Sequence, residues 1–338
     1  MNGIEAGKLI NEYGANARPF VFILDFELLN CLVYPLDELP DWISFSIRNK
    51  RVGRAITEAV DSVSEFPLFD IKPVSFSKYE RAFSEVLSEI QRGNTFLLNL
   101  SFPSLLNTTL SLSDIFKIAD APYRLLIDDI CTVFSPECFV KINDGIISTF
   151  PMKGTISALI PGAEKLLLSN EKEIAEHATV VDLLRNDLSI YASEVRVDKF
   201  MYIDSVVTHA GPLLQMSSKI SGKLPSNYNY IIGDILLSML PAGSISGAPK
   251  RETLRIISRE EHEPRNYYTG VFGVFDGTNL ESSVMIRYIE KRDGRLWYRS
   301  GGGITSMSVA ESEYREMIDK VYLPFRPNVN VNQGNNVF

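Results

Sequence analysis

Residues 267–304, YYTGVFGVFDGTNLESSVMIRYIEKRDGRLWYRSGGGI, decide the fold class of this chain. The stretch is rich in aromatic and β-branched residues, which favour strands. Asp276-Gly277 and Asp293-Gly294 interrupt it with dipeptides that are typical of tight hairpin turns. The stretch therefore predicts three consecutive antiparallel strands. They are residues 267–275, 281–291 and 295–300.

The rest of the chain also alternates between groups of strands and helices. Residues 138–142 and 146–150 predict another hairpin around Asn143-Asp144-Gly145. Other segments with a strand pattern are residues 20–25, 28–34, 96–100, 123–127, 195–197, 202–208 and 214–222. Because the strands come in antiparallel groups and not as regular βαβ units, we predict an α+β fold with antiparallel sheets packed between helix layers.

Helices are predicted from apolar periodicity and from the residues at their ends. Ser77 and Glu80 can form a capping box at the start of one helix, and Gly93 can stop it. The last helix is predicted to start at Ser308, which can form a capping box with Glu311 three residues later. Further helices are predicted at residues 171–184 after the cap Asn170, at 230–240, and from Pro249 onward.

Composition excludes several functional classes. The chain has 338 residues, is 45% hydrophobic and 22% charged, and carries a net charge of −8, which disfavours non-specific nucleic-acid binding. No stretch approaches the roughly 18 apolar residues of a membrane span, and the N-terminus has no signal-peptide pattern. Three cysteines at irregular spacing argue against a disulfide framework, so we expect a cytoplasmic protein. Three scattered histidines do not predict a zinc site or a serine triad.

The pentapeptide Pro151-Met152-Lys153-Gly154-Thr155 contains a candidate nucleophile. Burial makes the charged form of a lysine less favourable, and a neutral amine can attack electrophilic carbon. A lysine beside a glycine is more often an exposed residue at a turn, so the motif alone leaves both interpretations open.

The predicted last helix carries a candidate cation site. Glu313 and Glu316 are three residues apart and share one helix face, which Lys320 continues one turn later. Such a pattern usually marks a solvated, salt-bridged surface helix. The alternative is a Mg²⁺ site, because Mg²⁺ takes a few carboxylates and fills its octahedron with water and substrate oxygens.

Two glycine-rich segments are candidates for anion binding. Ser300-Gly301-Gly302-Gly303-Ile304 follows a predicted strand, and its backbone N–H groups can approach an oxyanion. Residues 241–250, PAGSISGAPK, are small residues that enter a helix N-terminus. Neither segment has the spacing of a dinucleotide fingerprint or a phosphate-binding loop. Residues 175–187 contain a further candidate site residue, Glu176, within Ala-Glu-His. They also contain Arg185-Asn186-Asp187, which can equally be a hydrogen-bonded helix end.

In their order and spacing, these blocks resemble the chorismate-utilising enzymes, which include anthranilate synthase component I, aminodeoxychorismate synthase component I and the isochorismate or salicylate synthases. The blocks are residues 93–100, 135–137, 151–155, 175–187, 241–250, 286–287, 300–304 and 313–316. The resemblance implies an anthranilate synthase component I-like fold. It divides the chain into a short strand-rich N-terminal segment packed on the core, a chorismate-binding catalytic domain and a disordered tail. These regions are residues 1–75, 76–325 and 326–338.

Within that family, a pentapeptide with lysine at this position resembles that of aminodeoxychorismate synthase, whereas anthranilate synthases carry alanine there. Lys153 thus implies conversion of chorismate and ammonia to 4-amino-4-deoxychorismate, for 4-aminobenzoate and folate synthesis, through a lysine adduct. Anthranilate synthase component I, isochorismate or salicylate synthase, and a catalytically silent binding subunit are the alternatives. Since the chain does not resemble a glutaminase, the ammonia is expected from a separate glutamine amidotransferase subunit.

The resemblance also implies a role for each site residue. Lys153 would be the nucleophile and Glu137 the acid that protonates the departing hydroxyl. The implied Mg²⁺ ligands, direct or through water, are Glu176, Glu313 and Glu316. The implied substrate-binding residues are Arg287, Gly303, Lys320, Ser246 and Gly247.

The chain departs from the family pattern at three positions. Gln215 stands where the family usually has a histidine that assists pyruvate elimination in anthranilate synthase, which disfavours that activity here. Ala242 replaces a common glycine, and Leu97 replaces a common glutamine. The N-terminal region is also shorter than in the longer relatives, so we do not expect a complete tryptophan-binding pocket.

Overall fold

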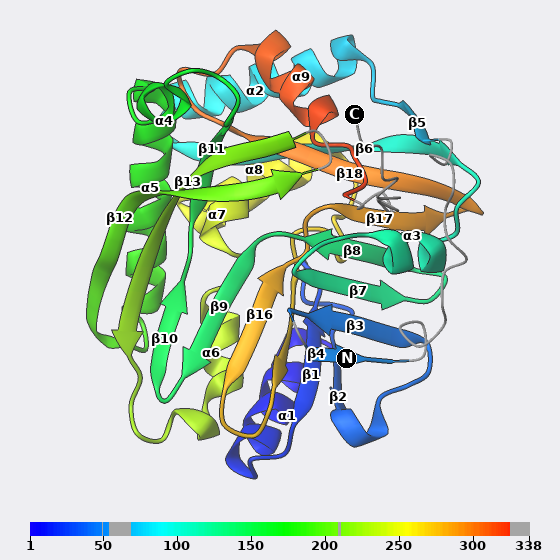
Figure 1. The fold of residues 1–338 in the computed structure, drawn as a ribbon, viewed down its shortest axis with the longest axis vertical. Coiled ribbons are helices and arrows are strands. Elements are labelled where there is room, and N and C mark those ends of the chain that lie inside the picture. The colour runs from blue at the N-terminus through cyan, green and yellow to red at the C-terminus, as the bar shows by residue number, and fades with distance from the viewer. Residues whose placement is uncertain (49, 54–68, 209–210, 325–338) are drawn as a thin grey trace, which may run out of the picture.

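A computed structural model describes residues 1–48, 50–53, 69–208 and 211–324. Within these ranges the strands form two sheets of nine strands each, and every strand pair is antiparallel. Figure 1 shows the two sheets with helices on their outer sides. No helix in the described ranges is both long enough and apolar enough to cross a membrane.

The first sheet joins the N-terminal strands to the middle of the chain. Its strands are β1 (Phe20–Leu24), β2 (Leu32–Pro35), β9 (Cys138–Asn143), β10 (Ile146–Thr149), β11 (Met152–Ser157), β12 (Ser193–Thr208), β13 (Gly211–Lys223), β15 (Val271–Phe275) and β16 (Leu280–Val284). Their order across the sheet is β11-β13-β10-β9-β16-β15-β1-β2, and β12 pairs with β13.

The second sheet joins the N-terminal strands to the end of the chain. Its strands are β3 (Ile43–Ile47), β4 (Lys50–Val52), β5 (Phe69–Lys72), β6 (Leu97–Thr108), β7 (Tyr123–Ile127), β8 (Cys131–Ser135), β14 (Gly247–Ala248), β17 (Tyr288–Arg292) and β18 (Arg295–Ile304). Their order is β14-β6-β18-β17-β8-β7-β3-β4, and β5 pairs with β6. Strands from residues 1–75 are thus integral to both sheets.

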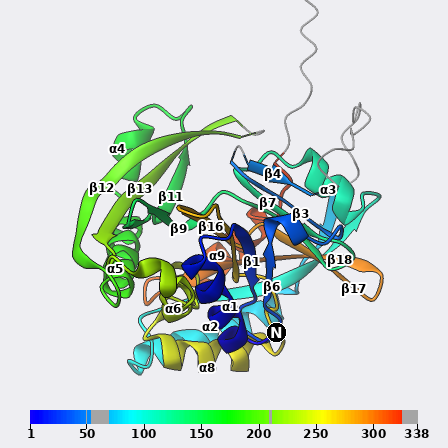
Figure 2. The ribbon, with the colours of Figure 1, turned by 90° about the horizontal axis from the view of Figure 1, so that it is seen from below.

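Helices cover the outer face of each sheet (Figure 2). The helices are α1 (Gly3–Ala15), α2 (Phe76–Gln91), α3 (Leu112–Ile118), α4 (Ala163–Leu167), α5 (Glu171–Leu188), α6 (Ile232–Ser238), α7 (Gly243–Ser246), α8 (Lys250–Glu261) and α9 (Ala310–Asp319). Helices α1, α5 and α6 pack on the first sheet, and α2, α8 and α9 pack on the second. The predicted α+β class, with antiparallel sheets between helix layers, is confirmed.

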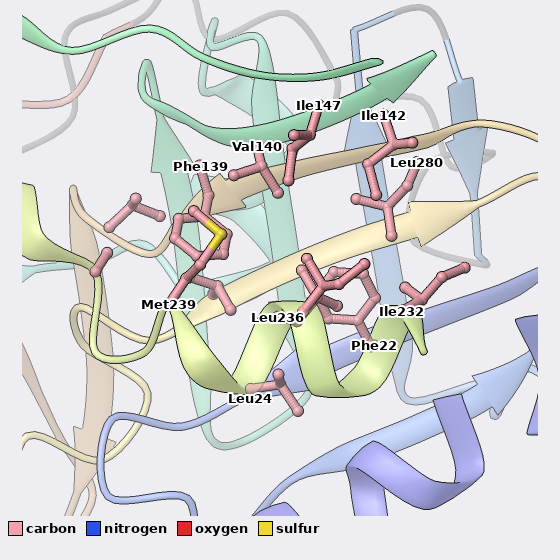
Figure 3. Close-up of a cluster of buried hydrophobic side chains, with 14 of the residues drawn as sticks. Phe22, Leu24, Phe139, Val140, Ile142, Ile147, Ile232, Leu236, Met239 and Leu280 are labelled. Atoms are coloured by element: carbon pink, nitrogen blue, oxygen red, sulfur yellow. The ribbon is translucent and has the colours of Figure 1, made fainter. Parts of the chain in front are cut away.

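The core shows why β1 is buried along its whole length. Phe20, Phe22 and Leu24 point toward the helices, whereas Val21 and Ile23 point toward the second sheet, and all five are fully buried. Figure 3 shows α6 laid across the first sheet, with its apolar side chains against those of β1, β9, β10 and β16. Each such side chain contributes about 1.5–3 kcal/mol when buried.

The turns were predicted better than the helix caps. Asp144 (φ 49°) and Gly145 (φ 76°) form the two-residue hairpin loop, and Gly93 (φ 79°) follows the end of α2. The Asn170 side chain accepts from Glu173 N, so that predicted cap is confirmed. The caps at Ser77 and Ser308 are wrong. Ser75 caps α2, and the N-cap of α9 is Val309, which has no side-chain capping bond. Ser308 Oγ instead accepts from Thr305 N.

Residues 281–291 are not one strand, as the sequence pattern predicted. Strand β16 ends at Val284 in the first sheet, and β17 begins at Tyr288 in the second. Arg287 takes a positive φ of 54° at this crossover. A left-handed residue breaks the extended backbone, so the chain can leave one sheet and enter the other. Residues 195–197 and 202–208, in contrast, are joined in one bulged strand, β12.

Helix α1 was not predicted from the sequence. Asn2 and Glu5 form a capping box at its start, although three glycines weaken its intrinsic propensity. Gly7 packs so closely against α6 that a Cβ added to Gly233 would lie 2.1 Å from Gly7 O. The helix is therefore stabilised by a close tertiary contact more than by its own sequence.

Glu261, at the end of α8, forms a buried ion cluster with two arginines. Its carboxylate accepts from Arg265 Nη2 at 2.6 Å and from Arg299 Nη2 at 2.8 Å. Burial by itself would raise the pKa of Glu261, but the charges of Arg265 and Arg299 outweigh burial and lower that pKa below its ordinary value. The cluster therefore favours the charged carboxylate.

We expect Glu261→Gln to lower the free energy of unfolding at pH 7 by about 3 kcal/mol, because it leaves two buried guanidinium groups without their carboxylate. Since the folded-state pKa is depressed, this stabilisation is complete above the unfolded value of 4.5 and is lost as pH falls through the folded pKa. Urea denaturation at several pH values should show the difference from wild type shrinking in acid. The exposed Glu80→Gln is the control. Equal stability of Glu261→Gln and wild type at pH 7 would contradict the prediction.

Candidate active site

Lys153 lies on β11 and points toward helix α5. Its Nζ donates to Glu176 Oε2 at 3.1 Å, and both side chains are largely buried. Gly154 (φ 71°) forms a bulge that follows Lys153 in the pairing with β13. A Cβ on Gly154 would lie 3.0 Å from Leu167 Cδ1 of α4, so the bulge requires glycine both for its backbone angle and for space.

The glycine run of β18 lies between Lys153 and helix α9. A Cβ added to Gly303 would lie 3.1 Å from Lys153 Nζ and 3.9 Å from Glu176 Oε2. A Cβ on the neighbouring Gly302 would lie 3.4 Å from Glu313 Oε2, 3.8 Å from Glu316 Oε1 and 3.9 Å from Lys320 Nζ. The absence of side chains here lets charged groups from β11, α5 and α9 reach one stretch of backbone. The structure thus brings together six predicted site residues: Lys153, Glu176, Gly303, Glu313, Glu316 and Lys320.

Helix α9 places Glu313 and Glu316 next to this stretch, and the two differ in exposure, because the Glu316 side chain is 49% exposed. Glu313 is only 1% exposed. Lys320 Nζ bonds to Glu316 Oε1 at 2.7 Å and to Gly301 O at 3.0 Å, which attaches the end of the helix to β18. The buried Glu313 fits a binding site, whereas the partly exposed Glu316–Lys320 pair fits the salt-bridged helix that the sequence pattern also allowed.

The pKa values of the two lysines shift in opposite directions. Burial lowers the pKa of Lys153, but Glu176, Glu316 and Glu173 outweigh burial and raise the pKa above its ordinary value. For Lys320, burial and the nearby charge of Lys153 outweigh Glu316 and lower the pKa. The carboxylates that oppose burial at Lys153 come from two helices, α5 and α9.

Arg287 lies beside the C-terminal end of α9. Its Nη1 donates to Lys320 O, and its guanidinium stacks 4.6 Å from the centre of the Tyr322 ring. Its Nε is buried and has no hydrogen-bond partner among the described residues. The crossover between the two sheets thus places the Arg287 guanidinium against the backbone of Lys320, and a shared role in binding a carboxylate stays a prediction.

Ser246 and Gly247 lie on the opposite side of β6 from the β18 glycines. Gly247 pairs with Leu98, and Leu98 pairs with Ile304. Gly247 has φ 122°, and a Cβ there would lie 1.8 Å from Leu97 O, so only glycine fits. Ser246 is buried, and its Oγ donates to Ala242 O at 2.9 Å. The Ser246 hydroxyl therefore holds the turn in shape.

Glu137 lies in the connection between β8 and β9, half-buried. Its backbone is fixed by Val284 N and Ser283 Oγ, which both donate to Glu137 O. The β9–β10 hairpin ends on this side of the sheet and leads directly into β11. Its acid role stays a prediction.

Two residues at the site were missed in the sequence analysis. Glu173 lies one turn before Glu176 on α5, and its Oε2 would be 3.1 Å from a Cβ on Gly154. The same three-residue spacing that singled out Glu313 and Glu316 could have identified it. His177 is fully buried, and its Nε2 lies 2.6 Å from Ser218 Oγ on β13. Burial and Lys153 lower the pKa of His177 to about 4, so it is a neutral link between α5 and the sheet.

The three departures from the family pattern lie close to the same backbone. Leu97 is buried, and its Cδ1 would be 3.1 Å from a Cβ on Gly303, so an apolar group lies beside the glycine run. Ala242 accepts the hydrogen bond from Ser246. Gln215, on β13, pairs with Thr155 on β11 and with Asp204 on β12.

The donor set can be tested for its fit to Mg²⁺. In the described part of the chain, no three Asp, Glu, His or Cys side chains lie close enough to ligate one ion directly. Lys153 and Lys320 instead engage Glu176 and Glu316. The donors are hard carboxylate oxygens around one stretch of backbone, and Mg²⁺ commonly takes one or two carboxylates with water and substrate oxygens. The residues fit Mg²⁺ bound in that way.

Comparisons with known proteins agree with this geometry. An uncharacterised PabA-like protein of Haemophilus influenzae is 49% identical over 93% of this chain and 94% of its own length. The aminodeoxychorismate synthase component 1 of Bacillus subtilis is 32% identical over 74% of this chain and 55% of its own length. The crystal structure of anthranilate synthase component I from Streptococcus pneumoniae matches with a TM-score of 0.65 at 28% identity, over 77% of this chain and 60% of that one. A sequence model of the chorismate binding enzyme family matches residues 44–325. The chain therefore belongs to the chorismate binding enzyme family, whose members act on chorismate.

Proposed function

We propose that this enzyme is component I of an aminodeoxychorismate synthase, which converts chorismate and ammonia to 4-amino-4-deoxychorismate and water. The observation that carries the proposal is the position of Lys153 Nζ, 3.1 Å from Glu176 Oε2 and beside the Gly302–Gly303 backbone that α9 faces. A primary amine at the centre of such a site is suited to covalent catalysis.

In the proposed reaction, the Lys153 amine forms a bond to the ring carbon next to the one that bears the carboxylate. The two ring double bonds shift, the C4–O bond breaks, and Glu137 donates the proton with which the hydroxyl leaves as water. Ammonia then bonds to C4, the double bonds shift back, and the lysine–carbon bond breaks. The amine must first lose a proton to solvent, and the proton that ammonia gives up on bonding to C4 restores the acid form of Glu137.

Charged groups on both sides of β18 support the binding of a dicarboxylate. We assign the enolpyruvyl carboxylate to Arg287, Lys320 and the amides near Gly303, since a guanidinium with a buried, unbonded Nε is suited to a carboxylate. Glu176, Glu313 and Glu316 are assigned to Mg²⁺. When bound, the ion would hold the ring carboxylate and neutralise carboxylates that keep Lys153 protonated.

A separate glutamine amidotransferase subunit is the proposed source of ammonia. A glutaminase requires a reactive cysteine, but Cys31, Cys131 and Cys138 are all buried here. Burial raises the pKa of the Cys31 and Cys138 thiols to about 12, so neither forms a thiolate at neutral pH. The Bacillus subtilis relative is described as component 1, which fits an enzyme with a second component.

Anthranilate synthase component I is the second candidate, because a solved structure of that name shares the fold at 28% identity. Two features favour the first candidate. Lys153 supplies an amine where the sequence comparison expects alanine in anthranilate synthases, and Gln215 replaces the histidine expected to assist pyruvate elimination.

The product made from chorismate separates the candidates. We expect purified enzyme with chorismate, Mg²⁺ and ammonium to release 4-aminobenzoate only after an aminodeoxychorismate lyase is added, with products separated by chromatography. Anthranilate formed without the lyase would identify an anthranilate synthase. Isochorismate or salicylate formed without ammonium would identify a water-using synthase, and unchanged chorismate a silent subunit. Each of the last three results would overturn the proposal.

A further inference from the structure

One buried guanidinium connects the two glycine segments of the site. Arg265 Nη2 donates to Asn99 O at 2.7 Å, and Asn99 is paired with Gly303 across β6 and β18. Arg265 Nη1 donates to Ile245 O at 3.2 Å, and Ile245 directly precedes Ser246 and Gly247. A single planar group thus bonds to the backbone beside each segment.

The orientation of this guanidinium is fully determined by its surroundings. Its remaining N–H groups bond to Glu261 Oε2 at 2.9 Å, Glu261 Oε1 at 2.6 Å and Thr269 Oγ1 at 3.2 Å. The Arg265 side chain is 1% exposed, and its Cζ lies 4.7 Å from the centre of the Phe26 ring. All five N–H groups of the planar Arg265 guanidinium are therefore used. The distance between the oxygens that accept them cannot change without breaking a buried hydrogen bond.

A lysine could not replace this connection. An ammonium is a compact charge on a flexible chain, so it can pair with Glu261 but cannot hold Asn99 O and Ile245 O at a fixed separation at the same time. The backbone carbonyls on which the connection depends belong to β6 and α7, which are far apart in sequence.

We infer that Arg265 is a positioning residue for chorismate: it sets the distance between the Gly303 strand and the Ser246–Gly247 turn without touching the substrate. The inference rests on the family-level substrate and not on which product is formed. The positioning role of Arg265 can therefore be wrong while the proposed aminodeoxychorismate synthase activity is right. The positioning role can also be right if the enzyme makes another product from chorismate.

The test compares Arg265→Lys with Arg292→Lys in the full-length protein. Arg292 pairs with the buried Glu290 and with Glu263, so its replacement also weakens a partly buried ion cluster, but one far along β17 from the glycines. Chorismate consumption is followed by absorbance, which does not depend on the product. Chorismate affinity is measured by calorimetry with Mg²⁺ in a Lys153→Ala background, where no adduct can form.

We expect Arg265→Lys to raise the KM and the Kd for chorismate by about tenfold or more, with kcat changed by less than about threefold. Arg292→Lys should leave both constants within about twofold of wild type. Unchanged KM and Kd in folded Arg265→Lys, a loss confined to kcat, or equal effects of the two variants would overturn the inference. If Arg265→Lys does not fold, Thr269→Val decides. It removes one guanidinium partner, and a KM equal to that of wild type would count against the inference, whereas a rise would support it.

Discussion

Lys153→Ala is expected to lower the rate of ammonium-dependent chorismate consumption by about 10³-fold or more. Alanine removes the amine that forms the proposed adduct, together with its hydrogen bond to Glu176. Steady-state absorbance gives the rate. Intact-protein mass spectrometry after mixing with chorismate, without ammonium, should detect an adduct on wild type that maps to Lys153 and is absent from the variant.

The matched control for this experiment is Lys219→Ala. Lys219 lies on β13, the strand that pairs with β11, but it is 38% exposed and bonds to Asp198 at 3.3 Å. Its removal should change the rate by less than about twofold, as for most exposed ion pairs. Full activity of Lys153→Ala, with no adduct on wild type, would exclude covalent catalysis by Lys153.

Glu176→Gln is expected to weaken divalent-cation binding by about 10- to 100-fold and to lower kcat/KM by about 10²-fold or more. The amide keeps the size of the side chain but removes the negative charge that both the cation and Lys153 require. Cation affinity can be measured without turnover, by electron paramagnetic resonance with Mn²⁺ as the probe. The activity loss should be partly restored by high Mg²⁺ concentrations.

Glu311→Gln is the control for the cation experiment, because Glu311 lies on α9 with Glu313 and Glu316 but is exposed. It should bind Mn²⁺ as wild type does. The assignment of Glu176 to the cation would be wrong if both variants bound Mn²⁺ equally well.

The fold class was predictable because the signals for hairpins and helix stops are local. Asp144-Gly145 and Gly93 take positive φ angles in turns that their side chains allow in isolation. The crossover at Arg287 was not predictable, since nothing in the pattern of residues 281–291 shows that its halves pair with different sheets. Helix α1 was missed for a similar reason. Its glycines lower its propensity, and the surface that stabilises it belongs to α6.

Several residues of the candidate site were predictable from the sequence, but their electrostatics were not. Lys153, Glu176 and Glu313 were singled out by motif, and they do meet at β18. The raised pKa of Lys153 depends on burial opposed by carboxylates from α5 and α9, whose positions are set by the tertiary fold. Arg265 was also missed, because its partners are backbone carbonyls, which carry no sequence signal.

The pairing of β6 with β18 has a consequence for biosynthesis. The twelve-residue strand β6 emerges from the ribosome well before β14 and β18, its neighbours at the site, and β18 is the last strand of the described chain to be translated. Until then the part of β6 that β5 does not pair displays an apolar edge whose amide and carbonyl groups lack strand partners, a surface prone to aggregation. Productive folding of this enzyme must therefore wait for the carboxyl-terminal segment, and chaperone protection matters most in that interval.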